Sequence, residues 1–347
     1  MPKVLVTGAS GFVAEHLIPL LRSEGWFVFG IDRKSEPSAF CDEFKSLDLV
    51  DLQDICLDGH SFDLVIHLAA ARADWGVSDS EFYRDNVEAS KSLILALREI
   101  QVSKIIFVSS VSVMPQATSA CLDESAPYDP INAYGFSKKD AELLFIENHR
   151  MSQGADLAII RPSVLYGPSN PKNTGIYRAV DNNIFRLIDG IYSKRFAIVG
   201  NGKTIKTTAY VKNFVDSIIF AAENTRGYEL YVYADAPPSE MQELVKDIRQ
   251  QLGKSGAGRR LPFFFIRRVA GVFDWLSRLT KVNFPITRAR IDTFVRPTNF
   301  KPVNFISKGF KQQYSTTAAL KETVDWYVNL KKKSLTNFFF FREDGQE

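Results

Sequence analysis

The chain has 347 residues, 45% of them hydrophobic and 24% charged, a composition typical of an ordinary folded globular protein. This composition excludes the disordered, collagen-like and disulfide-scaffold classes. The formal net charge is only +3, but residues 254–311 hold thirteen lysines and arginines against two aspartates, a local charge of +11 that would attract anions.

Three widely spaced cysteines, Cys41, Cys56 and Cys121, predict neither a disulfide framework nor a zinc cluster, and they favour a reducing compartment. The first residues run directly into an apolar segment and leave no room for a signal peptide. No stretch of eighteen apolar residues is present to span a membrane. We therefore expect a cytoplasmic protein that would meet a membrane only peripherally, at its inner face.

Strand and helix patterns alternate over the first 160 residues. Buried-type strands are predicted at 4–6, 26–31, 63–70, 104–108 and 157–160, and helices at 12–21, 80–100 and 134–150. Because strands that alternate with helices form a parallel, doubly wound sheet, the sequence predicts an α/β fold of the Rossmann type.

Beyond Arg161 the alternation becomes sparse, and prolines, glycines and asparagines are frequent up to residue 175. This change predicts a second, smaller domain of mixed α/β structure. We assign 1–165 and 205–236 to the Rossmann domain, 166–204 and 237–335 to a substrate-binding domain, and 336–347 to a tail.

A glycine turn follows the first strand and opens the first helix. Its residues are Gly8, Ser10, Gly11, Phe12 and Val13, with Ala14 where a third glycine is often found. Glycines at this junction let the backbone approach a pyrophosphate held at the helix N-terminus. The pattern predicts a dinucleotide-binding site.

An acidic residue completes the dinucleotide pattern. Asp32 ends the second strand, twenty-four positions after Gly8, where a carboxylate accepts hydrogen bonds from an adenosine ribose. The same carboxylate repels a 2′-phosphate, so NAD is favoured over NADP, although the neighbouring Arg33 softens this preference.

Three further residues predict proton-transfer chemistry. Tyr134 and Lys138 are four positions apart and therefore share one helix face, and Ser110 follows the strand at 104–108. A lysine cation near a phenol lowers its pKa, which would make Tyr134 a general base, and Ser110 would hydrogen-bond the reacting hydroxyl. We interpret these three residues as catalytic.

With these motifs the chain resembles the extended short-chain dehydrogenase/reductase family, in particular its NAD-dependent sugar epimerase/dehydratase branch. The resemblance covers nearly the whole length and rests on the glycine turn, the three residues above and the further motifs Asp48-Leu49, His67 to Ala70, Asp85 to Val87, Ser109-Ser110, Arg161-Pro162 and Thr208 to Val211.

The resemblance implies further site residues. Asp48 and Leu49 would hold the adenine, Asn86 would lie beside the nicotinamide ribose, and the remaining cofactor residues would be Leu68, Ala69, Ala70, Arg72, Ser109 and Pro162, together with Tyr134 and Lys138. Lys206 and Arg296 fall where the family places basic groups on the substrate diphosphate.

Two departures from the family pattern narrow the expected reaction. Val111 and Ser112 occupy the positions where 4,6-dehydratases have an Asp-Glu pair, and expelling water from a sugar needs such an acid and base, so a dehydratase is disfavoured. Met114-Pro115 replaces the usual tyrosine-glycine and leaves the shape of the sugar pocket open.

The closest resemblance is to N-acetylhexosamine 4-epimerases of surface-polysaccharide assembly, some of which act on sugars attached to undecaprenyl diphosphate. Residues 254–311 suit such a lipid substrate, and the apolar and basic stretch 261–268 resembles a segment for peripheral membrane contact. Core packing explains its phenylalanines equally well.

The sequence therefore predicts an NAD-dependent 4-epimerase of a diphosphate-activated hexose or N-acetylhexosamine, carried by UDP or by undecaprenyl diphosphate. Two alternatives stay open: an NAD(P)H-dependent 4-ketosugar reductase and a non-catalytic dinucleotide-binding protein. We expect no nucleic-acid partner, because no such motif accompanies the basic segment. The resemblance to the family implies a homodimer whose interface is formed by the helices at 80–100 and 134–150.

Overall fold

The computed structural model describes residues 1–54, 57, 59–72, 77–116, 120–151, 154–170, 183–256, 258–280 and 295–343. Cys56, Lys281, Arg288 and Arg290 lie outside the described residues, as does Asp292.

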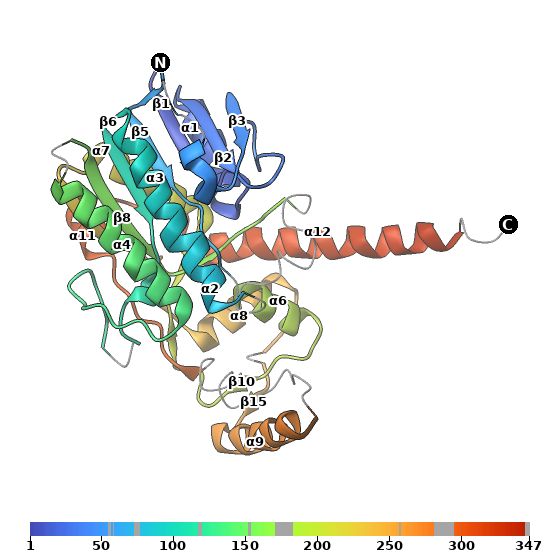
Figure 1. Cartoon of the computed structure of the whole chain (residues 1–347). Coiled ribbons are helices and arrows are strands. Elements are labelled where there is room, and N and C mark those ends of the chain that lie inside the picture. Colours follow the sequence, from blue (N-terminus) through green and yellow to red (C-terminus); the bar gives the residue numbers. More distant parts are fainter. Residues whose placement is uncertain are drawn as a thin grey trace.

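A parallel sheet forms the centre of the fold (Figure 1). It has seven strands in the order β13-β8-β7-β5-β1-β2-β3. Every neighbouring pair in it is parallel. The strands are β1 (Lys3–Thr7), β2 (Phe27–Asp32), β3 (Glu43–Ser46), β5 (Leu64–His67), β7 (Lys104–Val108), β8 (Asp156–Pro162) and β13 (Tyr228–Tyr233). This architecture confirms the predicted doubly wound α/β fold.

Helices cover both faces of this sheet. Side chains alternate between the faces of a strand, so Val4 and Val6 pack toward α1 (Phe12–Ser23), α7 (Val211–Asn224) and α11 (Val303–Ser307). Leu5, between them, packs toward α3 (Ala89–Arg98) and α4 (Ala133–Met151). Burial on both faces explains why the strand sequences are continuous apolar runs rather than alternating ones.

The helix expected at 80–100 has three parts. A capping box of Ser78 and Glu81 starts α2 (Asp79–Phe82), a π-helical turn, η2 (Tyr83–Glu88), follows, and α3 completes the run. Apolar periodicity cannot reveal the π-helical turn. Such turns occur frequently at functional sites, and this one carries the buried Asn86.

Two sheet strands were not predicted. β3 and β13 lie at opposite edges of the sheet, and β13 pairs with β8 although 65 residues of chain separate Pro162 from Tyr228. Local periodicity does not encode a pairing over such a distance.

A second apolar core lies beside the sheet. It joins α6 (Asn183–Tyr192), α8 (Met241–Gln251) and the first part of α12 (Thr316–Glu343), whose last turns extend away from the body (Figure 1). The domain boundaries given above stay a prediction.

Several short elements and one further long helix complete the described structure. They are β4 (Ser61–Phe62), β6 (Gln101–Val102), β9 (Val164–Tyr166), β10 (Ile198–Val199), β11 (Ile205–Lys206), β12 (Thr208–Tyr210), β14 (Ser239–Glu240), β15 (Arg260–Leu261), the 3-10 turns η1 (Leu49–Asp54) and η3 (Val111–Val113), and α9 (Phe263–Thr280). In the part of the chain that the structure describes, no helix has the length and apolar character needed to cross a bilayer.

Candidate active site

The turn between β1 and α1 is built so closely that only glycine fits at its first position. Gly8 has φ +72°, and a Cβ there would lie 2.7 Å from the backbone nitrogen of Ala69. The Gly8 amide donates a hydrogen bond to the Ile31 carbonyl at 2.8 Å. The turn therefore holds the carboxyl ends of β1, β2 and β5 against one another.

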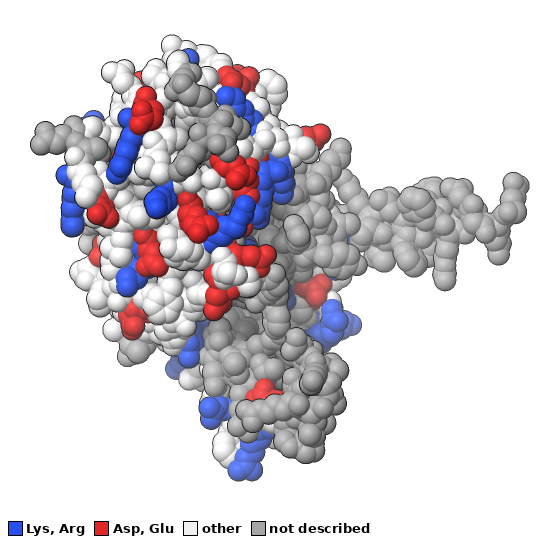
Figure 2. All heavy atoms as spheres, in the orientation of Figure 1, with Lys and Arg blue, Asp and Glu red and all other residues white. Residues whose placement is uncertain are grey.

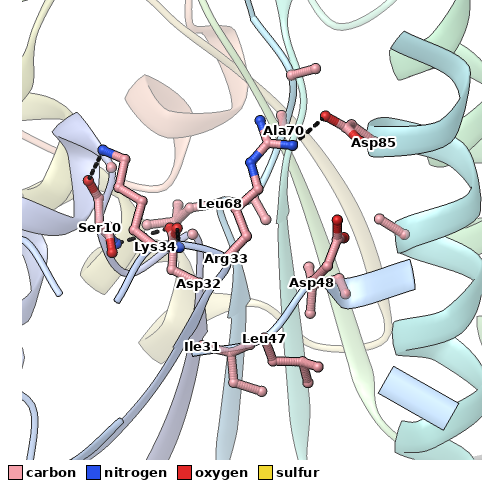
Figure 3. A pocket seen from close by; sticks show the side chains of 16 residues that line it. Ser10, Ile31, Asp32, Arg33, Lys34, Leu47, Asp48, Leu68, Ala70 and Asp85 are labelled. Atoms are coloured by element: carbon pink, nitrogen blue, oxygen red, sulfur yellow. Dashed lines mark hydrogen bonds and ion pairs between the residues drawn. The ribbon is translucent and has the colours of Figure 1, made fainter. Parts of the chain in front are cut away.

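A pocket opens at these strand ends, beside the point where the strand order reverses between β1 and β5 (Figure 3). Ligands of open α/β sheets bind at such a switch point. Ten of the predicted cofactor residues line it: Gly8, Ser10, Gly11, Asp32, Arg33, Asp48, Leu49, Leu68, Ala69 and Ala70. It is also lined by residues that the sequence analysis did not assign to the cofactor: Ile31, Lys34, Leu47, Ala71, Asp85 and Ala89.

Asp32 is held at the mouth of this pocket by backbone amides. Its two carboxylate oxygens accept hydrogen bonds from the amides of Ser10 and Lys34, each at 3.0 Å. Figure 3 shows Arg33 and Asp85 pointing toward each other, and the guanidinium lies 2.8 Å from the carboxylate. This ion pair reduces the charge that Arg33 would offer to a 2′-phosphate, which supports the preference for NAD.

A buried polar network links the strand ends to the helices behind them. The side-chain oxygen of Asn86, Oδ1, accepts a hydrogen bond from the Ala71 amide at 2.7 Å, and its side-chain NH2 group donates to Ser137 Oγ at 2.9 Å. His67 lies in the same network, 2.6 Å from Thr7 Oγ1 and 3.0 Å from Ser90 Oγ. Asn86 thus connects the loop after β5 to α4.

The three predicted catalytic residues come together where β7 ends against α4. Ser110 Oγ accepts from the Ser112 amide at 3.1 Å and is also hydrogen-bonded to Tyr134. Lys138 is buried, and its ammonium donates to the Val108 carbonyl at 2.8 Å. A strand end and the first turns of one helix thus place a hydroxyl, a phenol and an amine together.

The structure corrects one expectation about the charge at this site. Burial raises the pKa of Tyr134, and the charge and hydrogen bond that act against this come from Arg72 and Ser110. Burial also lowers the pKa of Lys138 to about 7. The prediction that Lys138 lowers the tyrosine pKa is therefore wrong, because desolvation dominates and the opposing cation is Arg72.

The residues present fit a dinucleotide. Within the described residues no side chain caps α1 at Gly11, so backbone amides at its N-terminus stay available for a pyrophosphate. Ser109 Oγ is buried and has no hydrogen-bond partner among the described residues, which leaves a polar group for a ligand to satisfy. Asp32 supplies the carboxylate for a ribose.

Lys206 and Arg296 also lie together. The half-buried Lys206 ammonium donates to the Arg296 carbonyl at 2.5 Å. Burial, with the Arg296 charge as a second cause, lowers the pKa of Lys206 to about 8. The Arg296 charge is thus near enough to act on Lys206, and two neighbouring cations suit a doubly charged anion.

The fold and these groups define a dinucleotide-dependent enzyme of the short-chain dehydrogenase/reductase type. The model of the NAD dependent epimerase/dehydratase family matches residues 4–233, and the chain belongs to this family. NAD is accordingly its cofactor.

The similar proteins include sugar epimerases. The chain is 32% identical to the N-acetyl-alpha-D-glucosaminyl-diphospho-ditrans,octacis-undecaprenol 4-epimerase of Escherichia coli O157:H7, over 96% of this chain and 98% of that protein. Its fold is similar to that of UDP-N-acetylglucosamine 4-epimerase from Methanobrevibacter ruminantium M1 (TM-score 0.71, 23% identity, 94% of this chain and 98% of that one). A similar match is UDP-glucuronic acid 4-epimerase from Bacillus cereus in complex with NAD (TM-score 0.67, 21% identity, 93% and 96%).

Proposed function

We propose that this protein is an NAD-dependent 4-epimerase of an N-acetylhexosamine attached through a diphosphate to a polyprenyl lipid. The observation that carries the reaction type is the meeting of Ser110, Tyr134 and Lys138 after β7, at the same carboxyl edge of the sheet at which the dinucleotide pocket opens. The lipid carrier is supported by the full-length similarity to an epimerase whose name specifies an undecaprenyl diphosphate substrate.

In this proposal the chain's own groups move one proton and hold the sugar. Bound NAD supplies a site that accepts a hydride and returns it. Tyr134, as the phenolate, takes the proton of the sugar 4-hydroxyl and, as the phenol, later gives it back, and Ser110 donates a hydrogen bond to the same oxygen as its charge changes. Lys138, fixed on the Val108 carbonyl, holds the helix turn that carries Tyr134 in place.

The sugar must turn over in the pocket while its diphosphate stays anchored, and we assign this anchoring to Lys206 and Arg296. Lys206→Gln should raise the KM for the sugar diphosphate at least about tenfold and change kcat much less, because it removes binding that is equal in ground and transition states. Lys203→Gln, an exposed change on the same segment, is the matched control. An unchanged KM in Lys206→Gln would contradict the assignment.

We also propose an oligomeric state and a cellular location for the protein. The protein is a homodimer that pairs through α3 and α4, and it works at the inner, cytoplasmic face of a membrane that residues 254–311 contact. Size-exclusion chromatography coupled to light scattering tests the oligomeric state. A molar mass of one chain would contradict it.

The reaction is tested with purified protein and no added cofactor. We would incubate it with N-acetylglucosaminyl-diphospho-undecaprenol in detergent and, separately, with UDP-N-acetylglucosamine, and follow the sugar by NMR. The galacto epimer from the lipid substrate supports the proposal. Conversion of UDP-N-acetylglucosamine alone would reassign the carrier, and turnover that needs added NAD(P)H and a 4-ketosugar would identify a reductase.

A further inference from the structure

Helix α9 lies at the far end of the molecule from the amino terminus (Figure 1). Several of its large apolar side chains are exposed to solvent. The exposed fractions are 65% for Phe264, 60% for Phe265 and 57% for Val272. Large apolar residues that are exposed one at a time are ordinary, but a contiguous group marks an interaction surface.

These side chains share the outer face of the helix. Phe264, Arg268 and Val272 follow one another at intervals of four residues and so form a single row, with Phe265 beside it. The inner face is marked by Ala270, which is fully buried. The exposed row is therefore the solvent side of an amphipathic helix, and Ala270 lies on the opposite side.

Basic residues are frequent in and just before this helix. Between Lys254 and Thr280 the chain has six lysines and arginines and one acid, Asp274. The Arg268 guanidinium lies over the Phe264 ring, 4.3 Å from its centre. Among the charged side chains visible at this end of the molecule in Figure 2, most are basic.

An exposed helix face that combines phenylalanine rings with neighbouring arginines suits an anionic lipid surface. An anionic bilayer offers phosphate groups to the guanidinium groups and, a few ångströms deeper, acyl chains to the rings. A protein partner would need complementary acids and a shaped pocket for the rings, whereas a bilayer needs only a helix lying flat with this composition.

We propose that the outer face of α9, formed by Phe264, Phe265, Arg268 and Val272 with Arg267 at its edge, docks on an anionic lipid bilayer with its axis parallel to the surface. The inference rests on the proposed function in one respect: docking brings the active site to the membrane in which a polyprenyl-linked substrate is held. The residues that dock are not those that bind the cofactor or the sugar.

The test is co-sedimentation of the full-length protein with vesicles of phosphatidylethanolamine and phosphatidylglycerol, compared with phosphatidylcholine alone. The wild type should bind the anionic vesicles, and binding should weaken with salt. The double variant Phe264→Ser/Phe265→Ser should bind at least about tenfold more weakly, because burying one phenylalanine accounts for a factor of that order. Arg267→Gln/Arg268→Gln should lose the preference for anionic lipid.

A matched control lies elsewhere on the surface. Phe40 is 67% exposed and also has an arginine over its ring, Arg22 at 4.4 Å, so Phe40→Ser removes an equivalent aromatic group outside α9. Its vesicle binding should equal that of the wild type. Equal loss in the Phe40 and α9 variants, or no binding by the wild type, would overturn the proposal.

Two more readouts separate the alternatives. If the α9 variants change the molar mass in solution, the face binds a second copy and the membrane proposal is wrong. Activity on the lipid-linked sugar in detergent should be unchanged in these variants. If the wild type is active in detergent but does not bind vesicles, the docking proposal is wrong and the proposed function stands. If it binds vesicles but epimerises neither substrate, the docking proposal is supported and the proposed function is wrong.

Discussion

Tyr134 is the residue on which the proposed chemistry depends, and its surroundings set the conditions for proton transfer. Burial raises its pKa, while the Arg72 charge and the Ser110 hydrogen bond lower it. Only the phenolate form of Tyr134 can accept a proton, so the Arg72 charge and the Ser110 hydrogen bond, which favour the phenolate, act against burial and toward the catalytic form.

Removal of the Tyr134 hydroxyl should separate chemistry from cofactor binding. Tyr134→Phe is expected to lower kcat by about 100- to 10,000-fold, the usual contribution of a general base, while NAD remains bound. Cofactor released on denaturation measures the second part. Tyr228→Phe, which removes a phenolic hydroxyl at a sheet edge, should behave as wild type, and activity retained in Tyr134→Phe would disprove the mechanism.

His67 should make the stability of the fold sensitive to acid. It is 1% exposed, and burial, with the Lys138 charge as a second cause, lowers its pKa to about 3. In the unfolded chain it takes a proton below about pH 6.5, so the unfolded state binds more protons and stability falls as pH drops from there toward 3. The loss at about pH 5 is roughly 2 kcal/mol.

His67→Gln tests this linkage, since an amide can hydrogen-bond Thr7 and Ser90 without titrating. Between about pH 7 and pH 5, the free energy of unfolding of the wild type should fall by roughly 2 kcal/mol more than that of the variant, as measured by urea titration. A slope equal to that of the wild type would show that His67 does not carry this dependence.

Among the elements, the turn between β1 and α1 carries the cofactor, and its requirement for glycine has two separable causes. Gly8 has both a positive φ and a backbone neighbour within 2.7 Å of a Cβ, whereas Gly25, at the other end of α1, has φ +86° and open space. Comparing the two positions isolates the effect of close approach.

Gly8→Ala and Gly25→Ala should each lose about 1–2 kcal/mol of stability from the left-handed backbone alone. Gly8→Ala should lose more, and it should also lose NAD binding, because Ala69 must move out of the pocket wall. Isothermal titration with NAD and urea unfolding check both parts. Equal behaviour of the two variants would show that the close approach has no consequence.

At the scale of the whole molecule, α12 fastens the second core to the cofactor helix. Trp326 Nε1 donates to the Ser169 carbonyl at 2.8 Å, and the same loop is held on α1 because Glu15 accepts from the Asn170 amide at 2.6 Å. Glu322 on α12 accepts from Tyr210 and Lys212 at the start of α7. The two cores are thus joined through residues 168–170.

Trp326→Phe should lower the free energy of unfolding by about 1 kcal/mol, the usual net value of one such hydrogen bond, while a ring remains to pack on Phe185. Lys321→Gln on the same helix breaks only an exposed ion pair with Asp325 and should change stability by less than about 0.5 kcal/mol. Two variants of equal stability would show that the Trp326 contact does not fasten the cores.

The sequence by itself determined the parts of this protein that depend on local pattern. The apolar runs predicted five of the seven sheet strands, the glycine spacing with Asp32 predicted the dinucleotide turn, and the interval from Tyr134 to Lys138 placed both groups on one helix face. Each of these signals lies within a few residues of chain or follows from one regular period.

Only the tertiary structure decided which distant residues meet. It joined β13 to β8, formed a π-helical turn around Asn86, and paired Arg33 with Asp85 in the pocket wall. It also made burial, not Lys138, the dominant influence on Tyr134, and left one face of α9 in solvent. These outcomes depend on desolvation and on contacts across long stretches of chain, which periodicity and spacing do not encode.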